Sequence, residues 1–383
     1  MNILLLTSVA GNGGSSATLF HNAKILAQSG CEPIFFAPGD YWKSRGAEEN
    51  VNVSNALELR RGFRPVSFLR DFLKLRRIIL DQKIDAIIVQ KSPEQWLAGL
   101  ALLGLKRRVV LVRLRGVVFA IKPSMFNRWL HNRMDAVICS AGVIAAHFRA
   151  LHGFRTDRLH TLLEGIDPQK FAPATPEQRA AARAKWKLDP AAIVIGTAGR
   201  PSPVKGHDVL LRAFAKAFRD NHEKNVRLAI FSDESRRGPG SYKSLSELAA
   251  ELGVRERVDL FPAFVDDMRG VYHALDAYAL PSLGSEGSSR AGLEACACGL
   301  PLIASRVGVL PDLVIDNKTG WLVPTGDVET LAIRLKELIT SRSASRQVGA
   351  AARLRIVELF DERHYGDVLR EMLQDAVRMK ARA

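Results

Sequence analysis

Short apolar runs alternate with amphipathic segments through the first half of this chain. Glycine or polar residues bound the runs, which is typical of strands buried on both faces of a parallel sheet. We predict strands at residues 2–9, 32–37, 86–89, 109–112 and 135–139. Helices are predicted between them at about 17–29, 65–82 and 95–105. This alternation predicts a parallel sheet that helices cover on both sides.

A second strand–helix series follows a change of composition at residues 172–190, which are polar and rich in Ala and Pro. We interpret 172–190 as a hinge followed by a surface helix. Beyond it, strands are predicted at 192–199, 226–231, 258–263, 277–282 and 300–305, and helices at 207–219, 243–252, 267–274 and 290–299. The tail from Glu358 to Ala383 has the pattern of one or two amphipathic helices.

The two series predict an α/β fold with two domains. Residues 1–168 form the first, completed by a C-terminal helix at about 360–383, and residues 169–359 form the second. Two such domains joined by a hinge would leave a cleft between the carboxyl ends of their sheets. Because ligands bind at these ends, the segments that directly follow strands are the candidate sites.

Composition narrows the class of protein. The chain has 383 residues, 47% of them hydrophobic and 25% charged, as in soluble globular proteins of two domains. Its cysteines, Cys31, Cys139, Cys296 and Cys298, suggest no disulfide framework, and two cysteines two apart on a helix do not face each other. We expect a reducing cytosol, no signal peptide and no transmembrane helix, because the apolar run 97–105 is too short to span a bilayer.

The net charge of +15 is unevenly distributed. Residues 1–170 hold 24 Lys and Arg against 13 Asp and Glu, whereas the remainder hold 31 against 27. This asymmetry indicates that the first half meets something anionic: nucleic acid, anionic lipid or a phosphorylated saccharide. Nucleic acid is disfavoured, because the basic residues lack interleaved aromatic residues and no known module is present.

The helix predicted at 65–82 is the candidate for a membrane contact. Its apolar positions Phe68, Phe72 and Leu75 recur at spacings of three and four residues. The cations beside them are Arg64, Arg70, Lys74, Arg76 and Arg77. This composition suits an interfacial helix near anionic lipid, and equally an ordinary amphipathic helix packed on a sheet.

Two carboxylates, Glu286 and Glu294, frame the most informative stretch. If the interval were fully helical, they would lie about 12 Å apart along the axis, roughly the reach of a nucleoside diphosphate sugar. Gly287, Ser288 and Ser289 come just before the predicted helix, whose N-terminus offers N–H groups to a diphosphate. Chance placement of two Glu residues is the alternative.

Two loops that follow strands carry further candidates. Arg200 and Lys205 follow the strand at 192–199, where two cations can clamp a diphosphate and stabilise it as a leaving group. Gly13 and Gly14 follow the first strand, where glycine lets a backbone approach a ligand closely. The alternatives are a pair of surface charges and a simple tight turn.

These motifs resemble the retaining GT-B glycosyltransferases of glycosyltransferase family 4. The resemblance rests on residues 199–214, 276–305 and 317–332, which follow the family's order and spacing, and on residues 162–173, which resemble its segment at the domain hinge. It covers about 160–335 well and the N-terminal part weakly. It implies two Rossmann-like domains that face each other across a donor and acceptor cleft.

The resemblance also implies roles for the candidate residues. Arg200 and Lys205 would hold the donor diphosphate, Glu286 the transferred sugar, and Glu294 the ribose. The amides of Gly287, Ser288 and Ser289 would contact phosphate oxygens, and Gly13 and Gly14 would line the cleft from the other domain. No metal or other cofactor is implied, and the chain agrees in having no DxD triplet.

The chain departs from the family pattern at several positions. Val204 stands where an acidic or amide residue usually precedes the Lys, Glu164 replaces the hinge Asn, and the family's Gly-Gly is only partly kept at Gly308-Val309. Gly116 stands where relatives often carry a His that reaches the donor sugar, and we expect Arg113 or Arg115 to serve instead, for an anionic group.

Two further side chains have competing interpretations. We expect Arg290 to be an exposed helix residue rather than a third contact to phosphate or carboxylate. For His207, we expect a capping or surface role rather than that of a catalytic base.

The leading hypothesis is a retaining, metal-independent glycosyltransferase that uses a nucleoside diphosphate sugar. Its acceptor would be a lipid-linked saccharide or lipopolysaccharide, reached from the cytoplasmic face of the membrane. The alternatives are a soluble transferase acting on a small sugar or sugar phosphate and, more distantly, a basic nucleic-acid-binding protein.

Overall fold

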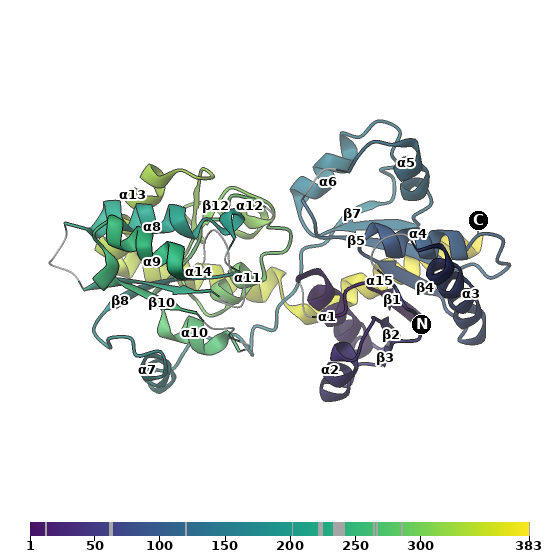
Figure 1. The fold of residues 1–383 in the computed structure, drawn as a ribbon, viewed down its shortest axis with the longest axis horizontal. Helices are drawn as coiled ribbons and strands as arrows, with labels where there is room; N and C mark the ends of the chain where they lie inside the picture. Colours follow the sequence, from purple (N-terminus) through teal and green to yellow (C-terminus); the bar gives the residue numbers. More distant parts are fainter. Residues whose placement is uncertain are drawn as a thin grey trace. The chain divides into compact units, whose positions relative to one another are not determined.

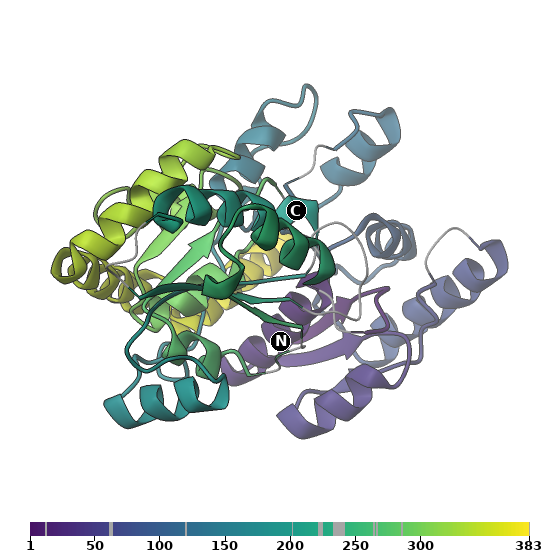
Figure 2. The same ribbon diagram turned by 60° about the vertical axis from the view of Figure 1, so that its left-hand side comes forward.

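The chain folds into two compact units, each an α/β domain (Figures 1 and 2). The computed structural model describes residues 1–11, 14–60, 64–118, 121–200, 202–220, 225–232, 242–262, 265, 267–284 and 286–382. The first unit comprises Met1–Gly165 and Glu362–Ala383, and the second comprises Ile166–Asp361. The chain therefore passes into the second unit after Gly165, where the sequence suggested a boundary at 168.

The first unit is built on a seven-stranded parallel sheet with the order β3-β2-β1-β4-β5-β6-β7. Its strands are β1 (Asn2–Leu6), β2 (Glu32–Phe36), β3 (Val53–Ser54), β4 (Ala86–Val89), β5 (Val110–Arg115), β6 (Ala136–Cys139) and β7 (Leu159–Thr161). Its helices are α1 (Gly14–Gln28), α2 (Tyr41–Glu49), α3 (Pro65–Asp81), α4 (Ser92–Ala101), α5 (Met125–Asn132), α6 (Gly142–Arg149) and α15 (Glu362–Arg382). The central strands are almost wholly buried, as their uninterrupted apolar sequences require.

The C-terminal helix α15 returns to the first unit and packs beside α1 (Figure 1). Its residues Tyr365, Leu369 and Leu373 join the core on the sheet face that α1 covers. A Cβ atom at Gly366 would lie 2.4 Å from Cγ2 of Ile25, so only glycine allows this approach. The first domain is thus assembled from both ends of the chain.

The second unit repeats the plan with six parallel strands in the order β10-β9-β8-β11-β12-β13. Its strands are β8 (Ile193–Ala198), β9 (Val226–Phe231), β10 (Val258–Phe261), β11 (Ala277–Leu280), β12 (Leu302–Ser305) and β13 (Trp321–Val323). Its helices are α7 (Pro176–Lys185), η1 (Pro203–Lys205), α8 (His207–Phe218), α9 (Tyr242–Glu251), η2 (Arg255–Arg257), α10 (Arg269–Ala274), α11 (Arg290–Ala297), α12 (Leu310–Leu313), α13 (Val328–Thr340) and α14 (Arg342–Leu359).

Both sheets share the Rossmann order, with the third, second and first strands followed by the fourth, fifth and sixth. The predicted fold class of two Rossmann-like α/β domains is confirmed. In such a sheet the chain reverses its direction of winding between the first and fourth strands, and ligands bind at the carboxyl ends there. That point lies between β1 and β4 in the first unit and between β8 and β11 in the second.

The segment interpreted as a hinge and a surface helix belongs wholly to the second unit. Its helix α7 begins with a capping box between Thr175 and Gln178. Arg183 on this helix is buried, and it donates to the Asp276 carboxylate at 2.8 Å and to three backbone carbonyls near β8. Most residues of α7 are exposed, so the predicted surface helix is confirmed, and a buried cation anchors it to the second unit.

The face of α3 on which the membrane hypothesis was built packs inward. Leu75 and Ile79 are fully buried, and Phe68 and Phe72 are partly covered. The apolar positions that α3 exposes lie on another face, at Val66, Leu69, Leu73 and Leu80. Within the described ranges, no helix is long and apolar enough to cross a membrane.

Candidate active site

The candidate residues of the second unit gather at the winding reversal of its sheet. Strand β8 leads to Arg200 and Lys205, and its neighbour β11 leads to Glu286. Because parallel strands end at the same edge, two loops far apart in sequence meet there. Arg200 is exposed, whereas Lys205 is three-quarters covered and Glu286 is almost fully buried.

An ion pair joins these two loops. The ammonium of Lys205 lies 2.6 Å from Oε1 of Glu286, and the hydroxyl of Ser282 donates to the same oxygen at 2.6 Å. Across the described part of the chain, both hydrogen bonds to this carboxylate go to Oε1. Oε2 of Glu286 and two of the three protons of Lys205 are therefore available to a ligand.

Backbone contacts hold the two loops in register. The amide of Leu283 donates to the carbonyl of Val204 at 2.7 Å. Gly206 adopts a φ of +64°, and a Cβ atom there would lie 2.1 Å from the carbonyl oxygen of Pro281. Glycine is therefore required beside Lys205, because a side chain would push the loops apart.

A third loop, which follows β12, fixes the backbone of Glu286. The amide of Val309 donates to the Glu286 carbonyl at 2.8 Å. Gly308 has a φ of +60°, and a Cβ atom there would lie 1.8 Å from that oxygen. Position 308 therefore requires glycine for steric reasons. Position 309 tolerates valine, because it contacts Glu286 through its backbone amide.

Helix α11 begins at Arg290, where the sequence predicted it, so the interval from Glu286 to Glu294 is helical only in its second half. Ser289 is the N-cap in the left-handed region, with a φ of 46°. Its hydroxyl is buried and has no hydrogen-bond partner in the part of the chain that the structure describes. Gly287 is buried and Ser288 half-buried, so the predicted anion seat is a short bend that leads into α11.

Glu294 lies on α11 and is buried. Its Oε2 accepts from the hydroxyl of Tyr272 at 2.8 Å, and its Oε1 accepts from Nε of Arg290 at 3.2 Å. Burial raises the pKa of the Glu294 carboxyl, and the nearby Arg290 opposes that shift. Arg290 therefore contacts a carboxylate within the protein, which corrects the expectation of a merely exposed residue.

His207 begins α8 but is only 2% exposed, so the expected capping or surface role is wrong. Burial, with a smaller contribution from Lys205, lowers the pKa of its imidazole to about 4. Nε2 of His207 is 3.5 Å from where a Cβ atom of Gly199 would lie. The neutral ring packs beneath the loop that carries Arg200 and Lys205.

The candidates of the first unit are less complete. Gly13 lies outside the described residues, and Gly14 is the exposed first residue of α1. Arg113, one of the proposed substitutes for the missing His, is 5% exposed, and burial lowers its pKa to about 9. Arg115 is half-buried, and burial lowers its pKa as well. Arg113 is therefore placed inside the sheet's helical cover rather than on a surface.

The sequence analysis missed Ser282 and Tyr272, which hold the two carboxylates. Ser282 follows β11 within two residues, so its position after a strand was an available signal. Tyr272 lies on α10, which precedes β11 in the chain, whereas Glu294 follows β11. The sequence pattern does not indicate that the two residues meet. Among the side chains that the structure describes, no group of three or more His, Cys, Asp and Glu residues could hold a metal ion.

Comparison with known proteins places both halves of the chain. Residues 178–355 match the family described as glycosyl transferases group 1, and residues 12–170 match glycosyltransferase family 4. The chain belongs to this family of glycosyltransferases. The resemblance inferred from its motifs is thereby confirmed.

Individual relatives agree with this assignment. The chain is 34% identical to a D-inositol 3-phosphate glycosyltransferase from Saccharomonospora viridis over 246 residues, which cover 63% of this chain and 56% of the relative. It thus spans about half the length of the curated relatives it matches.

Solved structures confirm the GT-B fold. A glycosyltransferase from Rickettsia africae superposes with a TM-score of 0.87 at 19% identity, with 98% of each chain covered. HepE from Anabaena in complex with UDP-glucose superposes with a TM-score of 0.81 at 21% identity, with 98% of this chain and 100% of that chain covered.

Proposed function

We propose that the protein transfers a sugar from a nucleoside diphosphate sugar to a saccharide acceptor, with retention of anomeric configuration and without a metal ion. The observation that carries the proposal is the Lys205–Glu286 pair at the winding reversal of the second sheet. In this pair, the ammonium of Lys205 can donate further hydrogen bonds, and Oε2 of Glu286 can accept one. A sugar diphosphate needs both, a cation at phosphate and an acceptor at hydroxyl.

Separate groups of the protein would hold the diphosphate, the sugar and the ribose of the donor. Arg200 and Lys205 meet the diphosphate, and the amides of Gly287, Ser288 and Ser289 donate to the remaining phosphate oxygens. Oε2 of Glu286 accepts a hydroxyl of the sugar. Glu294, which Tyr272 and Arg290 hold in place, accepts the ribose hydroxyls.

The chemical step would proceed on one face of the sugar. The bond from the anomeric carbon to the diphosphate oxygen breaks, and the acceptor oxygen bonds to the anomeric carbon on the same face. The acceptor's proton passes to the departing diphosphate. Arg200 and Lys205 stabilise the charge that develops on this leaving group, which is the part a divalent cation would otherwise take.

The acceptor is proposed to be a lipid-linked saccharide or lipopolysaccharide, met at the cytoplasmic face of the membrane. The excess of cations in residues 1–170 supports an anionic partner for the first unit. A second candidate is a small soluble sugar phosphate. It is favoured by the name of the relative from Saccharomonospora viridis, which acts on D-inositol 3-phosphate.

The first experiment is a thermal-shift screen of the purified chain against UDP, GDP, ADP, CMP and their sugar conjugates in EDTA. UDP-glucose is the natural starting point, because it is bound in the Anabaena structure of the same fold. A ligand that binds only the folded chain raises Tm in proportion to occupancy. Stabilisation in EDTA by one nucleotide class supports a metal-independent donor site. Stabilisation only with added Mg²⁺ would overturn that part of the proposal.

Retention is tested separately on the product. With the donor identified, the anomeric proton of the first-formed glycoside is read by NMR before any mutarotation. A product with the anomeric configuration of the donor supports the same-face step, and the opposite configuration contradicts it.

A further inference from the structure

A pocket lies in the first unit, beside α3 and α4. Its volume is about 560 Å³. Its walls are largely apolar, and the remaining lining is polar, basic or, at Asp71 and Glu94, acidic. The apolar lining residues are Leu59, Phe68, Trp96, Leu97 and Leu100, and the basic ones are Arg60 and Arg64. A mainly apolar cavity with a few placed polar groups is the usual form of a ligand site.

The inner end of this pocket reaches the winding reversal of the first sheet. Ser8 follows β1, and its amide donates to Oε1 of Glu94 at 2.6 Å. Glu94 is 1% exposed, and its Oε2 has no hydrogen-bond partner among the residues described. A buried carboxylate oxygen without a donor is costly, and an acceptor hydroxyl would satisfy it.

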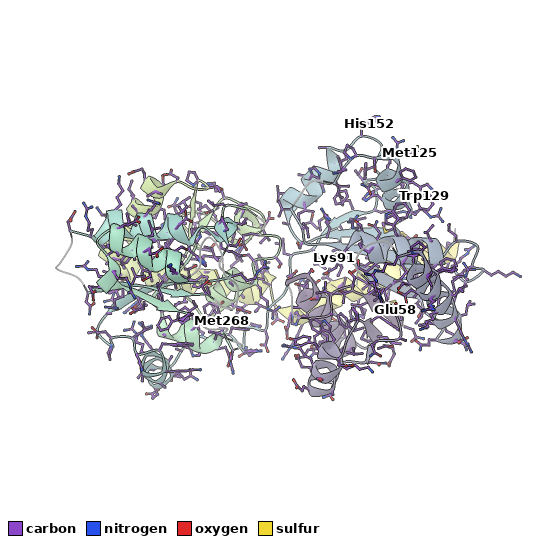
Figure 3. All side chains as sticks on the ribbon, viewed as in Figure 1. Glu58, Lys91, Met125, Trp129, His152 and Met268 are labelled. Carbon is purple, nitrogen blue, oxygen red and sulfur yellow. The ribbon has the colours of Figure 1, made fainter. Side chains whose placement is uncertain are left out.

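The turn before α3 is held in an unusual conformation that shapes the pocket. Leu59 has a φ of +43°, which a leucine rarely adopts. The buried carboxylate of Asp71 stabilises it by accepting from the amides of Glu58 and Leu59 at 2.8 and 2.9 Å. Glu58, labelled in Figure 3, marks this turn. Strain that the surrounding structure maintains in this way is often found at binding sites.

The outer wall of the pocket continues into an exposed apolar surface. Besides its packed face, α3 exposes Val66, Leu69 and Leu73, which are 66%, 57% and 58% exposed and share one side of the helix. Arg70 and Arg77 lie along the same side and are themselves highly exposed. Apolar side chains flanked by arginines are the composition of a helix that lies at a membrane surface.

Helix α5 adds to this surface. Met125 and Phe126 are 68% and 67% exposed, and Trp129, labelled with Met125 in Figure 3, is half covered. The ring of Trp129 stacks on Trp96 of the pocket wall, with centroids 5.7 Å apart. The guanidinium of Arg133 covers the Trp129 ring at 5.0 Å. The pocket and the two exposed helices are thus continuous.

We infer that this pocket binds the hydrocarbon chain of an anionic membrane lipid that carries the acceptor group, with Arg60 and Arg64 meeting its charged headgroup. The inference rests on the proposed function in one respect, that the lipid is the acceptor. The carboxylates of Asp71 and Glu94 are buried, whereas Arg60 and Arg64 are exposed, so the charge that the pocket presents to a headgroup selects an anionic lipid over a neutral one. The depth of the apolar pocket selects an inserted chain over a surface contact alone, because a soluble sugar phosphate has nothing to place among Phe68, Leu97 and Leu100.

The binding test uses vesicles of phosphatidylglycerol with brominated acyl chains, and phosphatidylcholine vesicles as the neutral comparison. The chain has five tryptophans, so the emission of Trp96 is obtained as the difference between the protein and its Trp96→Phe variant. We expect cosedimentation with phosphatidylglycerol and quenching of Trp96 emission, and much weaker effects with phosphatidylcholine. Absence of binding to phosphatidylglycerol, or equal binding to both lipids, would overturn the inference.

Matched substitutions separate the pocket from general surface effects. Arg64→Glu changes the charge by two units and should weaken binding roughly 25-fold, since each unit near an anionic surface contributes on the order of a fivefold affinity. Lys43→Glu makes the same charge change on exposed α2 and should stay within about twofold. Leu100→Phe narrows the pocket without adding a tryptophan and should strongly reduce quenching of Trp96, whereas Leu103→Phe, just past the end of α4, should not. Equal behaviour within either pair contradicts the inference.

Whether the bound lipid is the acceptor is tested by following the transfer of radiolabelled sugar. Radiolabelled sugar from the donor identified by thermal shift should partition into the organic phase with a lipid-linked saccharide. If the nucleotide binds and the vesicles do not, the lipid inference fails while the transferase proposal stands. If vesicles bind and quench but no nucleotide binds, the transferase proposal fails instead. Label found only on a water-soluble sugar phosphate overturns the acceptor assignment.

Discussion

The ammonium of Lys205 and the carboxylate of Glu286 lie 2.6 Å apart, although the residues are separated by 81 positions in the chain. The side chain of Glu286 is 5% exposed and that of Lys205 is 25% exposed. A carboxylate so deeply covered needs a cation, and this cation stands at the mouth of the same site. Stability and donor binding therefore depend on one pair.

Replacing Lys205 by Met should separate these two dependences. Removal of the cation leaves the Glu286 carboxylate buried with Ser282 as its remaining donor, so the free energy of unfolding should fall by about 1–3 kcal/mol. Loss of the charged contact to the diphosphate should weaken nucleotide affinity by roughly 10- to 100-fold. Chemical denaturation and isothermal titration measure the two effects.

The double variant Lys205→Met/Glu286→Gln provides the control for this pair. Neutralising the carboxylate should restore most of the lost stability but none of the nucleotide affinity. Lys318→Ala, an exposed lysine of the same unit, should change neither. Recovery of nucleotide binding in the double variant would mean that Lys205 acts only by neutralising Glu286 and does not contact the donor.

Gly308 should tolerate no side chain. In Gly308→Ala the new Cβ atom would lie 1.8 Å from the carbonyl oxygen of Glu286, and a φ of +60° is strained for alanine. We expect a loss of about 2–4 kcal/mol in stability together with weaker nucleotide binding, because the loop must move and Glu286 with it. Gly270→Ala, in α10 where nothing lies within 4 Å, should be neutral or slightly stabilising. Wild-type stability in Gly308→Ala would show that this loop yields without disturbing Glu286.

The strands of both domains could be predicted because a strand buried on both faces is a continuous apolar run, which can be recognised without knowing the tertiary packing. The predicted strands at 86–89 and 226–231 coincide with β4 and β9. Helix α5 was not predicted. It is short, and its exposed apolar side chains break the pattern of one buried face, so periodicity alone could not reveal it.

The candidate site could be predicted for residues that directly follow strands. It could not be predicted for residues whose position depends on how the helices pack. Arg200, Lys205 and Glu286 follow β8 and β11, so their convergence is a consequence of sheet order. The burial of His207 and the choice of Tyr272 as the partner of Glu294 depend on how α8 and α10 pack. On α3 the spacing of apolar residues identified a helix correctly, but it could not tell the packed stripe of Leu75 from the exposed one of Leu73.

Tyr272→Phe should weaken nucleotide binding without touching the ligand. Its hydroxyl is the buried donor to Oε2 of Glu294, and its loss leaves that carboxylate with Arg290 alone. We expect about a fivefold loss of affinity and a loss of about 1 kcal/mol in stability. Tyr365→Phe removes another buried hydroxyl, in the first unit, and should cost comparable stability with unchanged affinity. Equal nucleotide affinity in both variants would show that Glu294 does not contact the ribose.

His207 should make the stability of the second unit depend on pH. Burial and Lys205 depress the pKa of its imidazole from about 6.5 to about 4 in the folded chain. Between these two values the unfolded chain binds the proton and the folded chain does not. The neutral ring therefore contributes fully above pH 6.5, and its contribution is lost as the pH falls towards 4. The loss amounts to on the order of 3 kcal/mol.

The measurement is urea unfolding of wild type and His207→Gln from pH 7.5 to 4. Other groups titrate in this range, so the quantity of interest is the difference between the two proteins rather than either curve. Glutamine carries no titrating ring, so His207→Gln is less stable at pH 7.5, where it loses the packed imidazole, and the gap should narrow as the pH falls. A difference that stays constant across the range would mean that the imidazole has the same pKa in the folded and the unfolded chain, which would contradict the shift expected from burial.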